Sequence, residues 1–315
     1  MKTEYIILIV VGILLIYFFI SYFIYRRIFR TDSLKQPSGL VDQESAFFSS
    51  SWQWYMNIPK ETISIRSYDN VKLSAVYIPS FDEKSTNTAI LCHGYRSLNS
   101  DMAVIAKMYS ELGFRILLPD ARGHGLSKGV FTSFGYYERY DLKRWIQHIL
   151  RTYGATDNIL LHGVSMGAAT VILTTGLGIP DNVKMVVADS PFSNGFGLLS
   201  RSMQPKILNF FLPGVFAITY YLHKFIPGQI NVVKAAKKAI IPLFIFHGEK
   251  DTVCPIFMAK KIISASQAPF KELYCVPGAK HAEGYIVDKT GIEGRLLELI
   301  NTYFTLPKSV TSKKK

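Results

Sequence analysis

The sequence predicts an α/β fold in which a mostly parallel sheet is flanked by helices, with a helical cap insertion and one N-terminal transmembrane helix. From residue 62 onward, short apolar segments alternate with helical ones, as a parallel sheet with covering helices requires. Residues 5–25 carry no charge and are long enough to cross a bilayer as one helix. Between Asp189 and Glu249 the alternation breaks and no acidic residue occurs, which indicates an insertion.

The composition favours an ordered protein that associates with a membrane. The chain has 315 residues, 49% of them hydrophobic and 19% charged, which suits one large domain and an anchor. Its net charge of +13 favours anionic partners. Because no nucleic-acid-binding motif is visible, we expect an anionic lipid surface and no nucleic acid. The widely spaced Cys92, Cys254 and Cys275 suggest neither a disulfide framework nor a metal site.

Residues 1–30 are expected to form the anchor and its basic flank. The uncharged run ends at Tyr25 and is followed by Arg26 and Arg27, whereas a cleaved signal peptide would end in small residues. We therefore favour a single-pass membrane protein. Arg26, Arg27 and Arg30 all lie downstream of the run, so the positive-inside rule favours a cytoplasmic location for the domain that follows.

Three further units are expected after the anchor. Residues 31–60 carry Ser, Gln and Pro without a sustained period, which predicts a juxtamembrane linker. Trp52 and Trp54 within it suit either the headgroup level or packing against the domain. The main domain should cover residues 61–305, and residues 306–315 should form a basic tail.

The elements of the main domain follow from apolar periodicity and turn residues. An antiparallel hairpin is predicted over 61–79, with its turn at Asp69–Asn70. Predicted strands follow at 88–92, 114–119, 158–162, 183–188, 241–246 and 273–276. Predicted helices cover 102–112, 137–153, 166–175, 255–268 and 291–304. In such a sheet, ligands bind at the carboxyl ends of the strands.

The insertion is expected to be a helical cap over about 191–238. Its apolar run from Ile207 to Leu222 is interrupted by Asn209 and by Pro213–Gly214. These interruptions make a second membrane span a poor interpretation of the run.

The strongest local motif is Gly163-Val164-Ser165-Met166-Gly167. It follows a predicted strand and opens a predicted helix. A nucleophilic serine needs such a sharp strand-to-helix turn, because its hydroxyl must stand clear of the sheet, and flanking glycines allow the close backbone approach. We therefore predict that Ser165 is a nucleophile.

A serine nucleophile needs a base near neutral pKa and an acid that orients the base. His281 lies just beyond the last predicted strand, where a loop can place it over the sheet edge, and is the predicted base. Asp251 follows the preceding strand and is the favoured acid. Asp189 and Asp120, which also stand at strand ends, are the rival acids.

Acyl transfer also needs two N–H donors for the developing oxyanion. The backbone N–H of Met166, directly after the nucleophile, is one predicted donor. The other is assigned to the N–H of Tyr95, in the loop after the first core strand.

These segments together resemble the α/β-hydrolase superfamily, in particular its bacterial branch of serine-aminopeptidase-like, membrane-anchored hydrolases. The resemblance runs from residue 62 to about 304. The segments that carry it are His93–Tyr95, Asp120–Gly125, Gly163–Gly167, His247–Asp251 and Gly278–His281. It implies that no metal and no organic cofactor is needed, and that Asp120, Arg122 and His124 have structural roles.

The leading hypothesis is a serine hydrolase that cleaves a carboxylic ester through an acyl-enzyme intermediate. The anchor and the aromatic, basic cap favour an acyl or lipid-like small-molecule substrate. An amide or peptide hydrolase of the aminopeptidase type is the alternative, since the fold hosts both chemistries. A non-catalytic membrane scaffold is the third reading. The sequence leaves the oligomeric state open.

Overall fold

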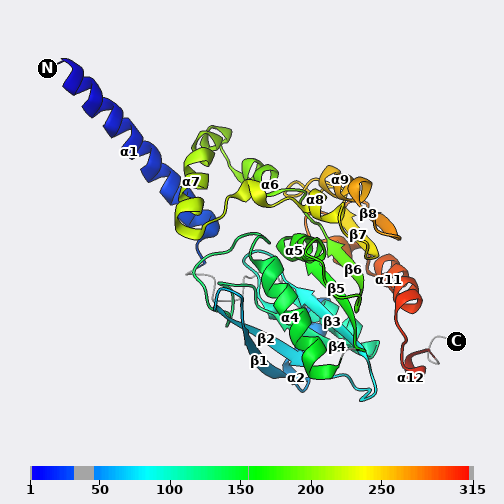
Figure 1. The fold of residues 1–315 in the computed structure, drawn as a ribbon. Coiled ribbons are helices and arrows are strands. Elements are labelled where there is room, and N and C mark those ends of the chain that lie inside the picture. Colours follow the sequence, from blue (N-terminus) through cyan, green and yellow to red (C-terminus); the bar gives the residue numbers. More distant parts are fainter. Residues whose placement is uncertain (1, 32–45, 155, 312–315) are drawn as a thin grey trace.

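The computed structural model describes residues 2–31, 46–154 and 156–311, and its centre is a mostly parallel sheet (Figure 1). Eight strands pair in the order β1-β2-β4-β3-β5-β6-β7-β8. Antiparallel pairing joins β1 to β2 and β2 to β4, and the remaining pairs are parallel. The strands are β1 (Glu61–Arg66), β2 (Lys72–Ile78), β3 (Asn87–Cys92), β4 (Arg115–Pro119), β5 (Asn158–Val164), β6 (Val183–Asp189), β7 (Leu243–Gly248) and β8 (Lys271–Val276). The predicted α/β class is confirmed.

Helices cover both faces of the sheet, and the strands supply apolar side chains to each. In β3, Ile90 faces one core while Ala89 and Leu91 face the other, as the twofold period of a strand dictates. The first face is covered by α4 (Glu138–Tyr153), α5 (Met166–Thr175), α8 (Val232–Ala236) and α9 (Phe257–Ala265). The second is covered by α2 (Ala46–Asn57), α3 (Ala103–Glu111), α10 (Gly284–Val287) and α11 (Lys289–Tyr303).

The strand and helix predictions of the main domain agree with the structure to within a few residues at each end. The region before the domain differs. Residues 46–57, expected to be linker, form α2, and its Tyr55 hydroxyl donates to Asn99 at 3.0 Å. Trp52 and Trp54 pack against the second core, as one of the two expectations for them had it. The rest of the expected linker, 32–45, lies outside the described residues, as does the end of the basic tail, 312–315, beyond the short helix α12 (Lys308–Thr311).

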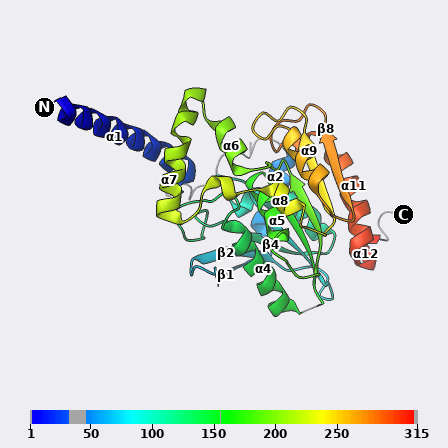
Figure 2. The same ribbon diagram turned by 45° about the horizontal axis from the view of Figure 1, so that its top comes forward.

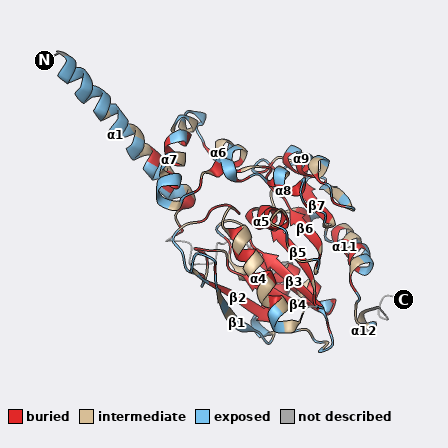
Figure 3. Ribbon diagram, in the orientation of Figure 1, coloured by how far each residue is buried: buried red, intermediate tan, exposed pale blue. Residues whose placement is uncertain are grey.

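The N-terminal helix α1 (Lys2–Phe29) is long and apolar enough to cross a membrane. Its outer part is exposed and projects away from the domain, whereas its base is buried (Figure 3). The helix continues past Arg26 and Arg27, which were expected to mark its flank. Tyr25 and Phe29 are buried among aromatic side chains, with the Phe29 ring against Phe134. The last turns of α1 are therefore part of the domain's core.

The predicted cap contains α6 (Gly195–Ser202), the 3₁₀ helix η2 (Lys206–Phe211), α7 (Leu212–His223), the 3₁₀ helix η3 (Pro227–Gln229) and α8. Both views show α7 lying beside the base of α1 (Figures 1 and 2). The end of the expected cap belongs to the main domain instead, because α8 buries Val232, Ala235 and Ala236 against α5.

One buried cation joins three segments of the domain. The guanidinium of Arg122, 1% exposed, pairs with Asp141 on α4 at 2.7 Å and with Asp69 in the β1–β2 turn at 2.9 Å. It also lies over the Tyr137 ring. Arg122 therefore has a structural role, as the sequence resemblance implied.

Replacing Arg122 by methionine should destabilise the domain strongly, because the buried Asp141 carboxylate then loses its counter-ion. We expect a loss of about 3–5 kcal/mol in the free energy of unfolding, typical of breaking a buried pair. Urea unfolding of the full chain in detergent micelles measures it. The matched control Lys107→Met removes an exposed pair with Glu111 and should cost less than about 1 kcal/mol. Equal losses in the two variants would contradict the role of Arg122.

Candidate active site

The turn between β5 and α5 forces Ser165 into a strained backbone conformation. Its φ is 53° and its ψ is −108°, outside the conformations that non-glycine residues favour. A Cβ on Gly163 would collide with the carbonyl of Gly167, and one on Gly167 would collide with the carbonyl of Cys92. Both glycines are therefore required, because α5 starts in contact with the ends of β5 and β3.

Three side chains from different parts of the chain meet at this turn. The Ser165 hydroxyl lies 2.8 Å from Nε2 of His281, and Nδ1 of His281 lies 2.7 Å from Oδ2 of Asp251. His281 stands in the loop after β8 and Asp251 in the loop after β7. The structure thus brings together the three residues that the sequence singled out.

The Asp251 carboxylate is buried and heavily hydrogen-bonded. Its Oδ1 accepts the backbone N–H groups of Val253 and Cys254 at 2.9 and 2.8 Å. Its Oδ2 lies 3.2 Å from Nε2 of His247, besides the contact with His281. Burial raises the pKa of Asp251, but the hydrogen bonds from His247 and His281 outweigh it and hold the pKa below its ordinary value. The carboxylate is therefore charged at neutral pH, and it is hydrogen-bonded to Nδ1 of His281.

The two rival carboxylates have other partners. Asp189 accepts a hydrogen bond from the Ser190 hydroxyl at 2.8 Å, and burial raises its pKa to about 6. Its backbone carbonyl accepts the N–H of Ser165, so it braces the turn. Asp120 accepts from the backbone N–H groups of Asn99 and Leu126. Of the three carboxylates, Asp251 is the one hydrogen-bonded to His281.

The expected oxyanion donors, Tyr95 and Met166, line the same cavity as Ser165. Within the ranges that the structure describes, the backbone N–H of neither residue donates a hydrogen bond to the protein. Both N–H groups are thus available to an oxygen bound beside Ser165.

Two neutral histidines fix the loop that carries Tyr95. Nε2 of His93 accepts the backbone N–H of Ala121 at 2.9 Å, and Nε2 of His124 accepts that of Arg96 at 3.3 Å. Burial lowers the pKa of each ring to about 4, so both stay neutral acceptors at neutral pH. The two rings therefore have positioning roles outside the triad.

The cavity over Ser165 has a volume of about 400 Å³ and a mostly apolar lining. Its walls come from α6, η2 and, unexpectedly, the base of α1. Residues of the lining include Ile24, Ile28, Leu198, Leu199, Met203 and Leu208. None of the described residues that line it is acidic, and Arg27 and Arg96 are its arginines. Reading the sequence as anchor plus domain gave no reason to expect α1 here.

No group of three or more His, Cys, Asp or Glu side chains suited to a metal ion occurs in the part of the chain that the structure describes.

Comparison with known proteins identifies the fold. Residues 83–213 match the family model described as serine aminopeptidase, S33. An esterase of Pyrococcus furiosus is 26% identical and superimposes with a TM-score of 0.64, over 79% of this chain and 94% of that one. This chain has the α/β-hydrolase fold. The esterase domain of a Rhodothermus marinus protein, 17% identical with a TM-score of 0.55, shares the fold over 78% of this chain and 99% of that one.

Curated relatives of this chain include the uncharacterized proteins YqkD of Bacillus subtilis and YfhR of Escherichia coli. YqkD is 26% identical over 70% of this chain and 76% of its own length, and YfhR of strain K12 is 25% identical over 71% and 74%. The family-model match includes Tyr95 and Ser165 but ends before Asp251 and His281. The geometry therefore carries the case for the latter two.

Gly167→Ala should disturb the turn that holds Ser165, because the new Cβ has no room beside the carbonyl of Cys92. We expect a loss of stability of about 2 kcal/mol or more, as for other strained or overpacked positions. The matched control is Gly294→Ala on α11, where a Cβ meets nothing within 4 Å and helix propensity should add about 0.5–1 kcal/mol. The free energies of unfolding of the two full-length variants test this prediction. A Gly167→Ala protein as stable as the wild type would contradict the close packing of α5 against the end of β3.

Proposed function

We propose that this chain is a serine hydrolase that cleaves a carboxylic ester with a hydrophobic acyl group. The observation that carries the proposal is the unbroken hydrogen-bonded series from Ser165 through His281 to Asp251. A serine held in a strained turn and hydrogen-bonded to an imidazole is the arrangement that nucleophilic catalysis needs.

The proposed reaction has two steps, acylation of Ser165 and hydrolysis of the acyl-enzyme. Ser165 Oγ attacks the ester carbonyl while its proton passes to Nε2 of His281, and the oxyanion accepts the N–H groups of Tyr95 and Met166. When the C–O bond to the alcohol breaks, His281 returns the proton to the departing oxygen and an acyl-Ser165 remains. Water then attacks the acyl carbonyl, gives a proton to His281, and Ser165 leaves with that proton as the acid forms.

The cavity favours esters of apolar acids over aminopeptides. A hydrolase for free amino termini needs carboxylates to bind the ammonium group, and none of the described lining residues is acidic. The Pyrococcus furiosus relative is described as an esterase. Peptide or amide hydrolysis, which the family description suggests, has only that description in its favour.

We further propose that α1 is a retained, single-pass membrane anchor and that the catalytic domain faces the cytoplasm. The length and composition of α1 support the span. Its packing into the core through Tyr25 and Phe29 supports retention, because removal of the helix would leave these contacts unmade. The net positive charge of the chain favours an anionic lipid surface as its partner.

Two variants of the full chain in detergent test the proposed triad. Ser165→Ala should lower kcat on short p-nitrophenyl esters by at least about 10³-fold and abolish labelling by a fluorophosphonate probe, because the nucleophile is gone. Asp251→Asn should lower kcat by about 10⁴-fold with KM little changed, because the imidazole loses its orienting charge.

Two controls accompany this test. Asp189→Asn should lower kcat far less, since its carboxylate accepts from Ser190 and the carboxylate hydrogen-bonded to His281 is that of Asp251. The exposed Ser64→Ala should leave kcat unchanged. Unchanged ester hydrolysis and probe labelling in Ser165→Ala would refute the proposed function. Faster turnover of aminoacyl anilides than of esters by the wild type would replace it with the peptidase alternative.

A further inference from the structure

If α1 spans the membrane as proposed, its residues show how deep in the bilayer the neighbouring cap lies. The uncharged run from Tyr5 to Tyr25 is about 31 Å long at a rise of about 1.5 Å per residue, close to the hydrocarbon thickness of about 30 Å. The proposed span therefore has little freedom to slide, and Tyr25 lies at one boundary of the hydrocarbon. Tyr17 then lies about 12 Å inside that boundary along the helix axis.

Contacts between α1 and the cap place η2 and α7 on this scale. The Tyr17 hydroxyl donates to the carbonyl of Phe210 at 3.2 Å, and the N–H of Gly214 donates to the same hydroxyl at 3.1 Å. At the other end of α7, the Tyr25 hydroxyl lies 2.5 Å from Nε2 of His223. The junction of η2 and α7 thus lies at the depth of Tyr17, and α7 ends at the hydrocarbon boundary.

At the junction, the first N–H groups of α7 have partners within the protein. The first N–H groups of a helix lack partners within it, and hydrocarbon supplies none. Here Pro213 has no N–H, Leu212 donates to the carbonyl of Asn209, and Gly214 donates to Tyr17. A Cβ at Gly214 would collide with Ser21, so this glycine also permits the close approach of the two helices.

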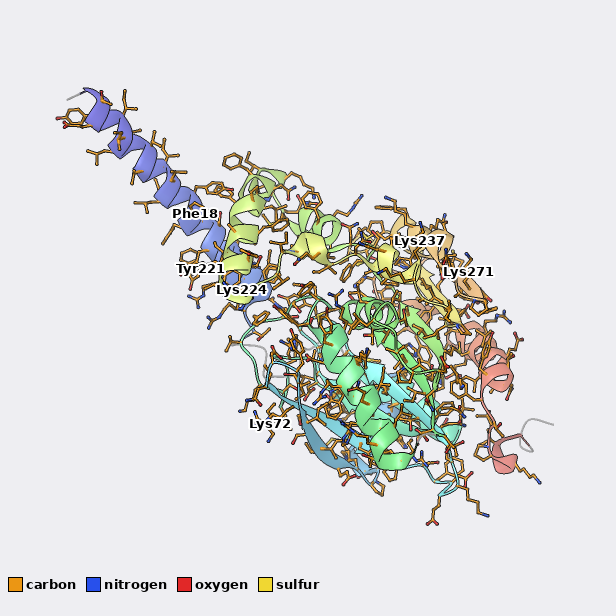
Figure 4. All side chains as sticks on the ribbon, viewed as in Figure 1. Phe18, Lys72, Tyr221, Lys224, Lys237 and Lys271 are labelled. Carbon is orange, nitrogen blue, oxygen red and sulfur yellow. The ribbon has the colours of Figure 1, made fainter. Side chains whose placement is uncertain are left out.

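The outward face of this unit is apolar and open. From Ile207 to Leu222 there is no charged residue, and Lys206 and Lys224 stand at the two ends. Ile207, Phe210 and Tyr221 are 72%, 67% and 77% exposed. Figure 4 shows Tyr221 on α7 near Phe18 on α1, with Lys224 at the base of α7, and an apolar groove lies between the two helices. Basic ends around an apolar centre suit a segment that enters and leaves the same leaflet.

We propose that η2 and α7 form a re-entrant hairpin, immersed beside α1 in one leaflet, whose partner is the acyl chains of the lipids. The inference rests on the proposed membrane span and is independent of the catalytic chemistry. It also gives the substrate a source: the cavity over Ser165 is lined by Ile24 and Ile28 of α1 and by Leu208 of η2, directly beneath the hairpin. A lipid ester in that leaflet is the substrate class that this location serves.

Spin labels on the full chain in vesicles of phosphatidylcholine and phosphatidylglycerol measure the depth. Cys275→Ser removes the exposed thiol and leaves the buried Cys92 and Cys254. Single labels are then attached at Phe210→Cys and Tyr221→Cys, and at Ile240→Cys as the control. Ile240 is likewise apolar and 73% exposed, but lies just before β7, away from α1.

We expect collisions of the Phe210 label with oxygen to exceed those with a water-soluble nickel chelate severalfold. The label at Tyr221 should be shallower, because it lies closer to the level of Tyr25, and the Ile240 label should collide mainly with nickel. Nickel access at 210 equal to that at 240 would overturn the hairpin. Protection from both reagents, with spin–spin broadening, would mean that a second copy covers the face, and would overturn it too. Fluorophosphonate labelling of Ser165 in the same samples reports the proposed function separately.

A second observation concerns the loop that carries Tyr95. The last carbonyls of a helix need outside donors, and at the end of α1 this loop provides them. The Tyr95 hydroxyl donates to the carbonyl of Ile28 at 2.7 Å, and the Arg96 guanidinium donates to that of Arg27 at 2.9 Å. We infer that α1 positions the backbone N–H of Tyr95 for the oxyanion, an inference that rests on the proposed function.

Tyr95→Phe removes the contact with Ile28 but keeps the backbone N–H and the ring against Phe134. We expect kcat on a short ester to fall about tenfold with KM unchanged, and the rate of fluorophosphonate labelling to fall in parallel. Both reactions need the backbone N–H of Tyr95 at the oxyanion, and the loss of the contact with Ile28 would displace it. The control is Tyr68→Phe, an exposed hydroxyl outside the site. A change in KM alone, or no change, would overturn the positioning role while leaving the wild-type labelling of Ser165 as evidence for the function.

Discussion

The contact between the start of α5 and the ends of β3 and β5 is the constraint on which the rest of the site depends. Because Gly163 and Gly167 carry no side chain, α5 can begin against the sheet, and Ser165 is held at a positive φ above its edge. The carbonyl of Asp189 on the adjacent strand fixes the Ser165 N–H. This backbone holds the Ser165 hydroxyl at the sheet edge, where His281 and Asp251 from the loops after β8 and β7 complete the hydrogen-bonded series.

Electrostatics keeps each group in the protonation state that its position needs. Asp251 stays ionised through its hydrogen bonds, although burial opposes the charge. Burial keeps His93 neutral, and burial together with the neighbouring His93 keeps His124 neutral, so that both rings accept backbone N–H groups. Asp189 and Asp120, whose pKa values burial raises, have backbone or hydroxyl partners instead. Similar residue types thus take distinct roles according to depth and neighbours.

The sheet, its helices and the grouping of Ser165, His281 and Asp251 could be predicted because each has a local signature. Strands show as short apolar runs, and the three residues stand where such runs end. The role of α1 in the cavity could not be predicted, because Ile24 and Ile28 read only as more apolar residues of an anchor. Residues 46–57 lacked a clear period, so α2 was missed. In the cap, Pro213 and Gly214 were interpreted as interruptions of the apolar run, and the structure places them in the first turn of α7. The side chain that accepts the Gly214 N–H, Tyr17, lies far away in the sequence.

The burial of Tyr25 and Phe29 divides α1 into two halves with different evolutionary freedom. A helix that serves only as a tether accepts any apolar sequence of sufficient length. The outer half of α1 has this latitude. Its inner half must fit the aromatic cluster, the cap and the cavity at once, as the interior of a soluble domain must. Tolerance to substitution should therefore change abruptly within a single helix. An anchor taken from another protein would supply a membrane span but not the side chains that complete the core and the cavity of the domain.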